Sequence, residues 1–245
     1  MPFRIICDFD GTIARKDVTD SLLEAFALPE WRLWETEWQA GRLGSRACME
    51  RQIGLLRASL EDLDDHLDRI DIDPGFARFV DHAQRLGCDL LVVSDGIDYA
   101  IQRILHRHGL GFLPVIANHL ERVGQDRYRL SFPHAHTLCS AAAGTCKCHV
   151  ARNHASSGRR HLLVGDGASD FCAAAQVDLV FAKDKLLRHC LERGLPHVPF
   201  VRFTRATWLL GALAQKKGLA SSLTHGVTSD MLPGHAGQAA TNFGS

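Results

Sequence analysis

The sequence predicts an α/β fold in which a parallel sheet is interrupted, after its first strand, by an inserted helical module. An apolar run at Phe3–Cys7 has the length and composition of a buried strand. From Pro74 onward, strand-like and helix-like runs alternate, which is typical of a parallel sheet covered by helices on both faces. Between these regions, residues 17–70 have helical periodicity and no strand pattern. The three observations together indicate a Rossmann-like core with a helical cap.

The helical module keeps its apolar residues three and four positions apart, so each group falls on one face of a short helix. The groups are Leu22, Leu23 and Phe26; Trp31, Trp34 and Trp38; Ile53, Leu55 and Leu56; and Leu60, Leu63 and Leu67. Breaks are expected at Pro29, at residues 41–44 and at residues 73–75. The three tryptophans either belong to a helix core or line a substrate cavity, and their spacing favours the core.

The core is expected to follow from Pro74 onward. The predicted helices are 74–86, 97–108, one that begins near Lys147, 168–175 and 183–192, and the predicted strands are 88–93, 114–117, 161–165 and 178–181, with an antiparallel hairpin at 118–133. Residues 1–14 and 75–215 should therefore form the core domain, and residues 15–74 the cap. A stretch rich in Gly, Ser, Thr and Ala without periodicity predicts a flexible tail at residues 216–245.

The composition excludes several classes of protein. Twenty-eight basic residues balance 28 acidic ones and neither forms a long run, so a nucleic-acid or acidic-membrane partner has no electrostatic support. No apolar run approaches the roughly 18 residues of a membrane-spanning helix, and the first residues lack a signal-peptide pattern. Eight cysteines among 245 residues are too few for a secreted disulfide framework. We therefore expect a cytoplasmic protein with reduced thiols.

Two carboxylates follow the first strand, in the run Asp8-Phe9-Asp10-Gly11-Thr12. The loops at the carboxyl ends of parallel strands form the ligand crevice of open α/β sheets. Two acids beside a buried strand can hold a hard cation such as Mg²⁺, or can divide the roles of nucleophile and proton carrier. Gly11 would allow the backbone to approach a ligand closely.

Three further polar sites stand at or near later strand ends. Ser94 and Asp95 follow a second apolar strand, and Lys147 begins a helix after a cysteine-rich loop. Asp166 and Asp170 lie in the turn Gly-Asp-Gly-Ala-Ser-Asp after a third strand. Each site alone has an ordinary structural explanation, such as a helix cap or a surface lysine. Their order and common setting instead indicate one active site.

These four motifs resemble those of the haloacid dehalogenase superfamily of phosphohydrolases, and the helical insert resembles the cap of its phosphoserine-phosphatase-like branch (subfamily IB). The resemblance extends from about residue 3 to residue 210. It implies that Asp8 attacks the substrate phosphorus and forms an aspartyl-phosphate. It also implies that Asp10 protonates the leaving oxygen and then activates water.

The same resemblance implies the ligands of a metal ion and of the phosphate. Mg²⁺ would be held by the Asp8 carboxylate, the Asp10 carbonyl and Asp166, with Asp170 in support. Thr12, Ser94 and Lys147 would bind phosphoryl oxygens. A phosphate dianion can approach an aspartate only when its charge is neutralised, and a cation with a lysine provides that neutralisation.

Two narrower resemblances point to different substrates. Glu30-Trp31, the run 54–56, Asn118-His119 and the stretch 132–147 resemble phosphatases of methionine salvage, which act on 2-hydroxy-3-keto-5-methylthiopentenyl-1-phosphate. The runs 165–172 and 93–95 look more like phosphoethanolamine/phosphocholine phosphatases. The sequence therefore leaves the substrate open between these two groups and a phosphoserine-like compound.

Asp95 departs from the Ser-Gly-Gly that usually follows the second strand in the salvage and phosphoserine enzymes. An extra acid beside a phosphate site opposes an anionic ligand, so it requires a reason. Together with Gly96 it lies where substrate would bind, and Asp95 either holds a substrate ammonium or caps the next helix. Two roles are likewise open for Asp17. It resembles the acidic cap residue that binds the substrate amine in phosphoserine phosphatases, and it could instead be an acid at a helix start that complements the helix dipole.

A cluster of possible zinc ligands lies within sixteen residues, at His134, His136, Cys139, Cys146, Cys148 and His149. Zinc sites need four nitrogen or sulfur ligands, and this cluster lacks the paired Cys-x-x-Cys spacing of a zinc ribbon. The resemblance implies no zinc requirement. Two interpretations of the cluster stay open. One is a structural metal site, and the other, less favoured, is a redox-sensitive cysteine pair beside Lys147.

The expected protein is a Mg²⁺-dependent phosphatase of a small phosphorylated metabolite, acting as a monomer or homodimer. The alternatives are a phosphotransferase, which would need an acceptor, a non-enzymatic phosphoacceptor domain and a metal-binding module. Phosphoacceptor domains also carry aspartates, a hydroxyl residue and a lysine on a parallel sheet. They need no cap, which argues against that alternative.

Overall fold

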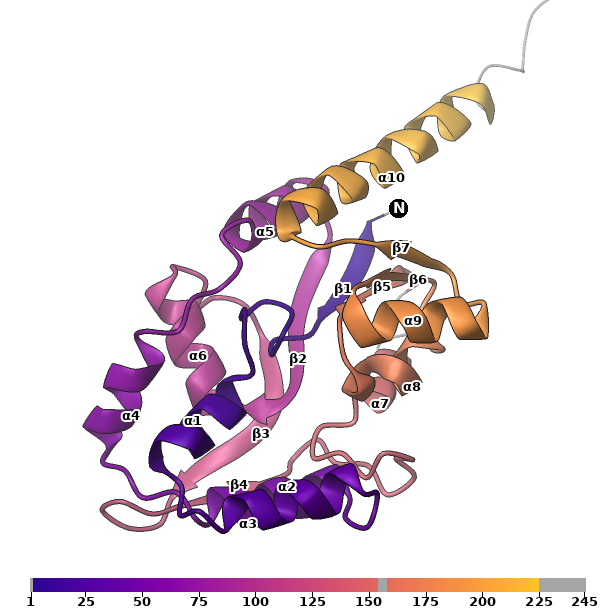
Figure 1. Ribbon diagram of the computed structural model, residues 1–245. Helices are drawn as coiled ribbons and strands as arrows, with labels where there is room; N and C mark the ends of the chain where they lie inside the picture. Colours follow the sequence, from indigo (N-terminus) through magenta and orange to yellow (C-terminus); the bar gives the residue numbers. More distant parts are fainter. Residues whose placement is uncertain (1, 154–157, 225–245) are drawn as a thin grey trace, which may run out of the picture.

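The computed structural model describes residues 2–153 and 158–224, with side chains up to residue 215, and it contains the α/β core and the helical insert that the sequence predicts (Figure 1). One sheet of seven strands has the order β4-β3-β2-β1-β5-β6-β7. The strands are β1 Phe3–Cys7, β2 Asp89–Ile97, β3 Val115–Arg122, β4 Tyr128–Ser131, β5 Arg160–Gly165, β6 Leu179–Ala182 and β7 His197–Pro199. All neighbours pair in parallel except β4, which is antiparallel to β3.

The central strand β1 sets the register of the sheet. Its last residue, Cys7, pairs with Val92 of β2 and Val164 of β5. The carboxyl ends of these three strands therefore meet at one edge, and the polar residues that follow them meet there too. This is the edge at which parallel α/β sheets bind ligands.

Apolar side chains alternate between the two faces of the sheet. Ile5 packs on the face covered by α5 Phe76–Arg85, α6 Asp98–Arg107 and α10 Phe203–Thr224, whereas Ile6 packs on the other face. The second face is covered by α7 Lys147–Asn153, α8 Phe171–Ala174 and α9 Asp184–Arg193. The sequence correctly predicted a sheet covered on both faces.

The predicted short strand and the first arm of the predicted hairpin are one strand, β3. Its start pairs in parallel with β2 and its end pairs antiparallel with β4. The strand β3 continues through Asn118, whose side chain is fully buried and whose polar atoms are hydrogen-bonded. A buried, satisfied amide can lie inside a strand without interrupting it.

The end of the chain differs from the prediction. The sequence did not predict β7 or α10, and α10 continues to Thr224, into the first part of the stretch expected to be a flexible tail. Leu, Ala, Gln and Lys are good helix formers, and the two interior glycines of α10, Gly211 and Gly218, cost only about 1 kcal/mol each. Residues 225–245 lie outside the described residues. In the described ranges, none of the helices has the length and apolarity that crossing a bilayer requires.

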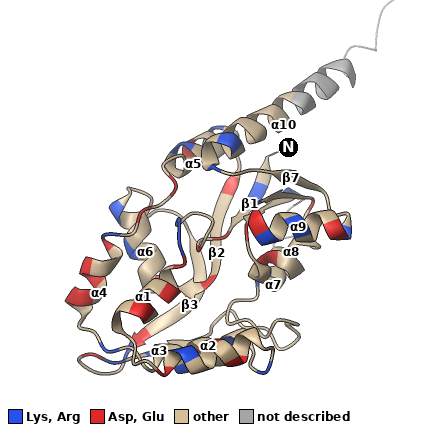
Figure 2. Cartoon of the chain, in the orientation of Figure 1, with Lys and Arg blue, Asp and Glu red and all other residues tan. Residues whose placement is uncertain are grey.

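The insert between β1 and β2 contains four helices, α1 Val18–Phe26, α2 Trp31–Gln39, α3 Ser45–Ile53 and α4 Leu60–Leu67. Its two connections to the core run side by side, since Ala14 and Ile72 form an antiparallel bridge. The insert lies over the carboxyl ends of the central strands (Figure 1). Figure 2 shows acidic and basic residues on the helices of both cap and core. The insert is thus placed as a cap over the expected ligand edge.

The tryptophans of α2 divide between the two expected roles. Trp31 is buried among apolar side chains, whereas Trp38 is 43% exposed and lines the cavity between cap and sheet. The cap is joined to the core at its far end by the Tyr128 hydroxyl, which donates to the carbonyl of Ala58 at 3.1 Å.

Candidate active site

A cavity of about 510 Å³ lies between the carboxyl edge of the sheet and the cap. The core contributes residues from all the predicted motifs except the buried Lys147. The core residues are Asp8, Asp10, Ser94, Asp95, Gly96, the run 166–169, Asp184 and Lys185. The cap contributes carboxylates, a tryptophan and sulfur-containing side chains. The cavity therefore joins the two parts of the chain that the sequence assigned to catalysis and to substrate selection.

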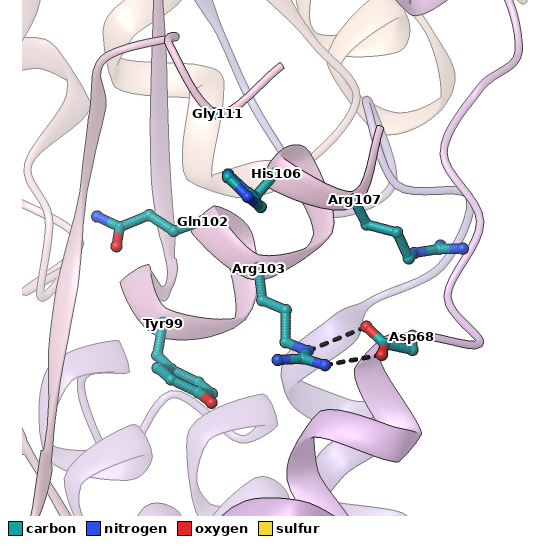
Figure 3. A pocket seen from close by; sticks show the side chains of 7 residues that line it. All are labelled: Asp68, Tyr99, Gln102, Arg103, His106, Arg107 and Gly111. Carbon is teal, nitrogen blue, oxygen red and sulfur yellow. Dashed lines mark hydrogen bonds and ion pairs between the residues drawn. The ribbon is translucent and has the colours of Figure 1, made fainter. Parts of the chain in front are cut away.

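A second hollow, of about 570 Å³, lies beside α6 and away from these motifs (Figure 3). Its charged groups are already engaged. The Arg103 guanidinium donates to Asp68 at 3.0 and 2.7 Å, and Arg107 donates to the carbonyl of Ile70. Its lining contains a histidine but no carboxylate pair or nucleophile–base pair, so the catalytic candidate is the cavity under the cap.

Asp8 immediately follows the last residue of β1. Its backbone N–H donates to the carbonyl of Val164 at 2.9 Å, which extends the strand pairing by one residue. The residue is 5% exposed, and its carboxylate accepts from the backbone N–H of Phe9 at 2.7 Å. Burial raises the pKa of Asp8 well above its usual value, the Asp170 charge adds to the rise, and the Lys147 ammonium opposes it. A buried, oriented carboxylate of this kind is suited to act as a nucleophile.

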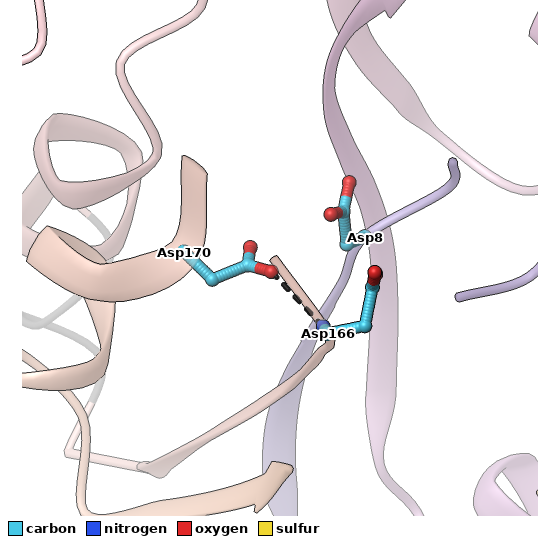
Figure 4. A group of neighbouring side chains, drawn as sticks. All are labelled: Asp8, Asp166 and Asp170. Atoms are coloured by element: carbon cyan, nitrogen blue, oxygen red, sulfur yellow. Dashed lines mark hydrogen bonds between the residues drawn. The ribbon is translucent and has the colours of Figure 1, made fainter. Parts of the chain in front are cut away.

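Two further carboxylates, those of Asp166 and Asp170, lie beside Asp8 (Figure 4). Oxygen atoms of Asp8, Asp166 and Asp170 all lie within 4.8 Å of one another. Asp170 is fully buried and accepts from the backbone N–H groups of Asp166 at 3.2 Å and Gly167 at 3.3 Å. Hard divalent cations prefer oxygen ligands of this type, so the residues fit such an ion. The Asp10 carboxylate points elsewhere, and its carbonyl stays a predicted ligand.

Thr12 and Gly11 shape this acidic group from the loop after β1. The Thr12 hydroxyl, expected to contact phosphate, donates to Asp166 at 2.5 Å, so its only proton already orients a carboxylate. Gly11 has φ +67°, and a Cβ there would lie 2.6 Å from the Asp166 carboxylate. Glycine is therefore required for both conformation and space. Burial raises the pKa of Asp166, and the Thr12 hydrogen bond partly offsets the rise.

Lys147 begins α7 and extends its buried side chain between two of these carboxylates. Its ammonium lies 2.7 Å from Asp8, 2.7 Å from Asp170 and 3.0 Å from the Ser169 hydroxyl. Burial alone would lower the pKa of Lys147, but the charges of Asp170 and Asp8 outweigh that effect and the pKa is raised. The lysine therefore stays charged beside the nucleophile.

Asp10 faces the cap side of the cavity. One carboxylate oxygen accepts from the backbone N–H of Val18, the first residue of α1, at 2.8 Å, and the other accepts from the Ser94 hydroxyl at 3.3 Å. Burial, followed by the charge of Asp17, raises the pKa of Asp10 to about 7. A Cβ on Gly96 would lie 2.5 Å from the Asp10 carboxylate, so this approach also requires glycine. A carboxyl with this pKa can give and take protons near neutral pH.

The two open substrate-binding candidates have different surroundings. Asp17 is the N-cap of α1, where its carboxylate accepts from the backbone N–H of Asp20 at 2.9 Å, and it also lines the cavity. Both of its expected roles therefore stand. Asp95 does not cap α6; it accepts hydrogen bonds from Ser45 and Thr145. The helix-cap interpretation of Asp95 is wrong.

The cysteine and histidine cluster gains little support as a metal site. The Cys146 and Cys148 sulfurs lie 3.3 Å apart, and the rings of His136 and His149 stack at 4.1 Å. Burial raises the pKa of Cys146 to about 12, which disfavours the thiolate that binds metal or reacts. In the part of the chain that the structure describes, the acidic group is the one set of three potential ligands close enough to hold an ion.

Several residues in or near the cavity were not predicted. Asp20 and Glu35 line its cap wall, and Ser45, Asn118 and Thr145 surround Asp95. Sequence signals existed for Asn118 alone: it is a polar residue inside an apolar strand, and Asn118-His119 belongs to the resemblance to methionine-salvage phosphatases. The others lie in helix or loop positions where polar residues are ordinary.

Comparisons with known proteins agree with this geometry. The family model of haloacid dehalogenase-like hydrolases matches residues 5–175. The chain is 33% identical to a 2-hydroxy-3-keto-5-methylthiopentenyl-1-phosphate phosphatase of Geobacillus thermodenitrificans, over 81% of this chain and 91% of that protein. It is 30% identical to a protein of the same name from Brevibacillus brevis, over 86% and 96% of the two chains.

Among solved structures, the chain is similar to a phospho-aspartyl intermediate analogue of phosphoserine phosphatase. The TM-score is 0.62 at 20% identity, and the match covers 84% of this chain and 97% of that one. A probable phosphoserine phosphatase from Vibrio cholerae gives a TM-score of 0.66 at 17% identity, covering 89% and 67%. The helices between β1 and β2 thus form a cap of the kind found in phosphoserine phosphatase.

Proposed function

The chain belongs to the haloacid dehalogenase-like hydrolase family, and we propose that it hydrolyses the phosphomonoester of a small metabolite, with Mg²⁺, through an aspartyl-phosphate on Asp8. The observation that carries this proposal is the group around Asp8. Lys147 lies 2.7 Å from the nucleophile, and two further carboxylates lie within metal-binding distance. Asp10, with a pKa of about 7, faces the same cavity.

In the first half of the reaction the Asp8 carboxylate attacks phosphorus and the bond to the leaving oxygen breaks. Asp10 gives its proton to that oxygen, because an alkoxide is a poor leaving group. In the second half a water molecule gives a proton to Asp10 and attacks the phosphoryl group, which releases phosphate and restores Asp8. Lys147 neutralises part of the phosphoryl charge in both halves.

A divalent cation would be held by Asp8, Asp166 and Asp170, with the Asp10 carbonyl. When bound, it supplies positive charge that offsets the repulsion between the phosphate and Asp8. Hard oxygen ligands favour Mg²⁺ over softer metals. The cap would close over the substrate and exclude bulk water.

The substrate that the relatives support is the methionine-salvage enol-phosphate, since the two relatives described above are named as phosphatases of that compound. A second candidate is a phosphomonoester that contains an amine, such as phosphoethanolamine, phosphocholine or phosphoserine. The cap wall of the cavity favours it, because Asp17, Asp20 and Glu35 bring three carboxylates beside Trp38. Acids and an aromatic face together attract an ammonium group.

Phosphate release from a panel of these four compounds tests the proposal, with Mg²⁺ and with EDTA. We expect metal-dependent release that Asp8→Asn abolishes. Asp89→Asn is the matched control: Asp89 begins β2 at the opposite edge of the sheet, where it pairs with Arg159 at 2.7 Å. Release that survives in Asp8→Asn would refute the proposed mechanism. Product that forms only with an added acceptor would indicate a phosphotransferase.

The same panel separates the two substrate candidates. If the cap acids bind an ammonium, Glu35→Gln raises the KM for amine-bearing substrates about tenfold and leaves the KM for the enol-phosphate unchanged, because one lost charged hydrogen bond or ion pair in an enclosed site has that order of effect. If the enol-phosphate is the substrate, it gives the highest kcat/KM and the Glu35→Gln effect is small for every compound.

A further inference from the structure

Asp95, at the carboxyl end of β2, receives hydrogen bonds from three separate parts of the chain. One carboxylate oxygen accepts from the Ser45 hydroxyl of the cap at 2.7 Å. The other accepts from the backbone N–H of Thr145 at 2.8 Å and from the Asn118 amide at 3.2 Å. The side chain is half-buried, so these contacts form at the boundary between cap and core.

Asn118 completes the network from β3. It is fully buried, it donates to the Asp95 carbonyl at 2.5 Å, and its own carbonyl oxygen accepts from the Thr145 hydroxyl at 3.0 Å. Thr145 is thereby held through both its backbone and its side chain. A Cβ on Gly144 would collide with Asn118 and Phe132, so the chain before Thr145 is also packed tightly against β3.

The position of Thr145 matters because Lys147 follows two residues later and begins α7. The Lys147 side chain is 1% exposed and reaches Asp8 and Asp170. The position of the Lys147 ammonium depends on where α7 begins. A shift of about 1 Å at an active site can lower the rate about 100-fold. Asp95 and Asn118 fix that start.

The Asp95 carboxylate is also hydrogen-bonded to the cap. Ser45 is the first residue of α3, and its neighbour Arg46 donates its backbone N–H to the carbonyl of Ala142 at 3.0 Å. Both contacts join the start of α3 to the core only when the cap lies against the sheet. Asp95 is thus the residue at which the cap, β3 and the loop before Lys147 meet.

We propose that Asp95 is a positioning residue that couples closure of the cap to the placement of Lys147. The proposal rests on the phosphatase function above, because Lys147 matters through its contact with Asp8. It gives Asp95 a role other than ammonium binding, because its carboxylate accepts three hydrogen bonds from the protein itself.

Hydrogen-bond chemistry distinguishes a positioning role from recognition of a substrate charge. In Asp95→Asn the amide oxygen can still accept from Thr145 and Asn118, and the amide nitrogen can donate to Ser45, because a serine hydroxyl both donates and accepts. The network can therefore persist without the negative charge. Asp95→Ala removes every one of these contacts.

The kinetic test compares Asp95→Ala, Asp95→Asn and Ser45→Ala on an amine-bearing and an amine-free substrate. We expect Asp95→Ala to lower kcat about tenfold or more and to raise KM, equally for both substrates, because hydrogen bonds to a charged group have that order of effect. Asp95→Asn recovers most of the loss. Ser45→Ala raises KM and lowers kcat less than Asp95→Ala does, because it frees the cap from Asp95 while Thr145 keeps its hydrogen bonds to Asp95 and Asn118.

A matched control and a double-mutant cycle sharpen this test. Tyr128→Phe removes another hydrogen bond between cap and core, remote from Asp95, and should leave kcat and KM unchanged. Ser45→Ala should add nothing in the Asp95→Ala background, since contacting partners are not additive. A selective KM increase for the amine substrate in Asp95→Asn would overturn the proposal. So would equal effects of Tyr128→Phe and Ser45→Ala.

Hydrogen exchange of the full chain tests the coupling without reference to catalysis. Asp95→Ala should speed amide exchange in both residues 45–53 and residues 144–147, and Asp95→Asn should do so much less. Unchanged exchange in either segment of Asp95→Ala would overturn the proposal. A wild-type protein that releases no phosphate would refute the function instead, and the exchange result would still decide whether Asp95 joins the two segments.

Discussion

Asp10 is the residue whose environment most directly limits the chemistry. Its carboxyl is placed between the first turn of α1 and Ser94, and its pKa is raised to about 7. The protonated form is needed to expel a leaving alkoxide, so the step that uses it slows when the pH rises through the pKa. The ionised form is needed to activate water in the second step.

The resulting prediction concerns pH. For an alkyl phosphate, kcat/KM should fall about tenfold per pH unit above about pH 7, because only protonated Asp10 can expel the alkoxide. For p-nitrophenyl phosphate, whose leaving group needs no proton, the fall should be absent. Asp10→Asn should slow the alkyl substrate much more than the aryl one. Identical pH profiles for both substrates would show that Asp10 is not the general acid.

At this scale the sequence predicted the residues better than their contacts. Asp8, Asp166, Asp170 and Lys147 were recognised because each follows a strand or begins a helix in a recognisable motif, and the structure brings them together. The partners of Thr12 and Asp95 were not predicted. Those hydrogen bonds join residues 154 and 50 positions apart, and only the packing of cap on core determines them.

At the scale of elements, the aromatic contact between α5 and α10 holds the last helix on the sheet. Phe203 is fully buried, and its ring lies 4.8 Å from that of Phe76 and 5.1 Å from that of Phe79. The sequence did not predict α10, whose last part lies in the stretch beginning at residue 216 that has the Gly- and Ser-rich composition of a linker. The buried aromatic at its start was the available signal.

Phe203→Ala should lower the free energy of unfolding by about 3–5 kcal/mol, the usual cost of deleting a buried phenylalanine side chain. It should leave kcat within about twofold, since Phe203 does not line the catalytic cavity. Denaturant unfolding and steady-state kinetics measure both quantities. Trp208→Ala on the same helix is the control, because Trp208 is 59% exposed and should change stability little. Equal destabilisation by the two variants would contradict this account of α10.

At the scale of the whole molecule, cap and core act on one cavity although they fold from different parts of the chain. The sequence separated them because helical periodicity without strands differs from strand–helix alternation. The arrangement of the cap over the sheet could not be predicted in the same way. It depends on contacts such as the Ala14–Ile72 bridge and the Val18–Asp10 hydrogen bond, which no local pattern encodes.

The central claim, that Asp8 is the phosphoryl acceptor, is tested most directly by trapping the intermediate. Wild-type protein in steady-state turnover with Mg²⁺ would be quenched in acid, digested and analysed by mass spectrometry. The account predicts one phosphoryl group on the carboxylate of Asp8, absent without substrate and absent in Asp8→Asn. Phosphate release during turnover with no phosphoryl group on Asp8, or with the group on another residue, would contradict it.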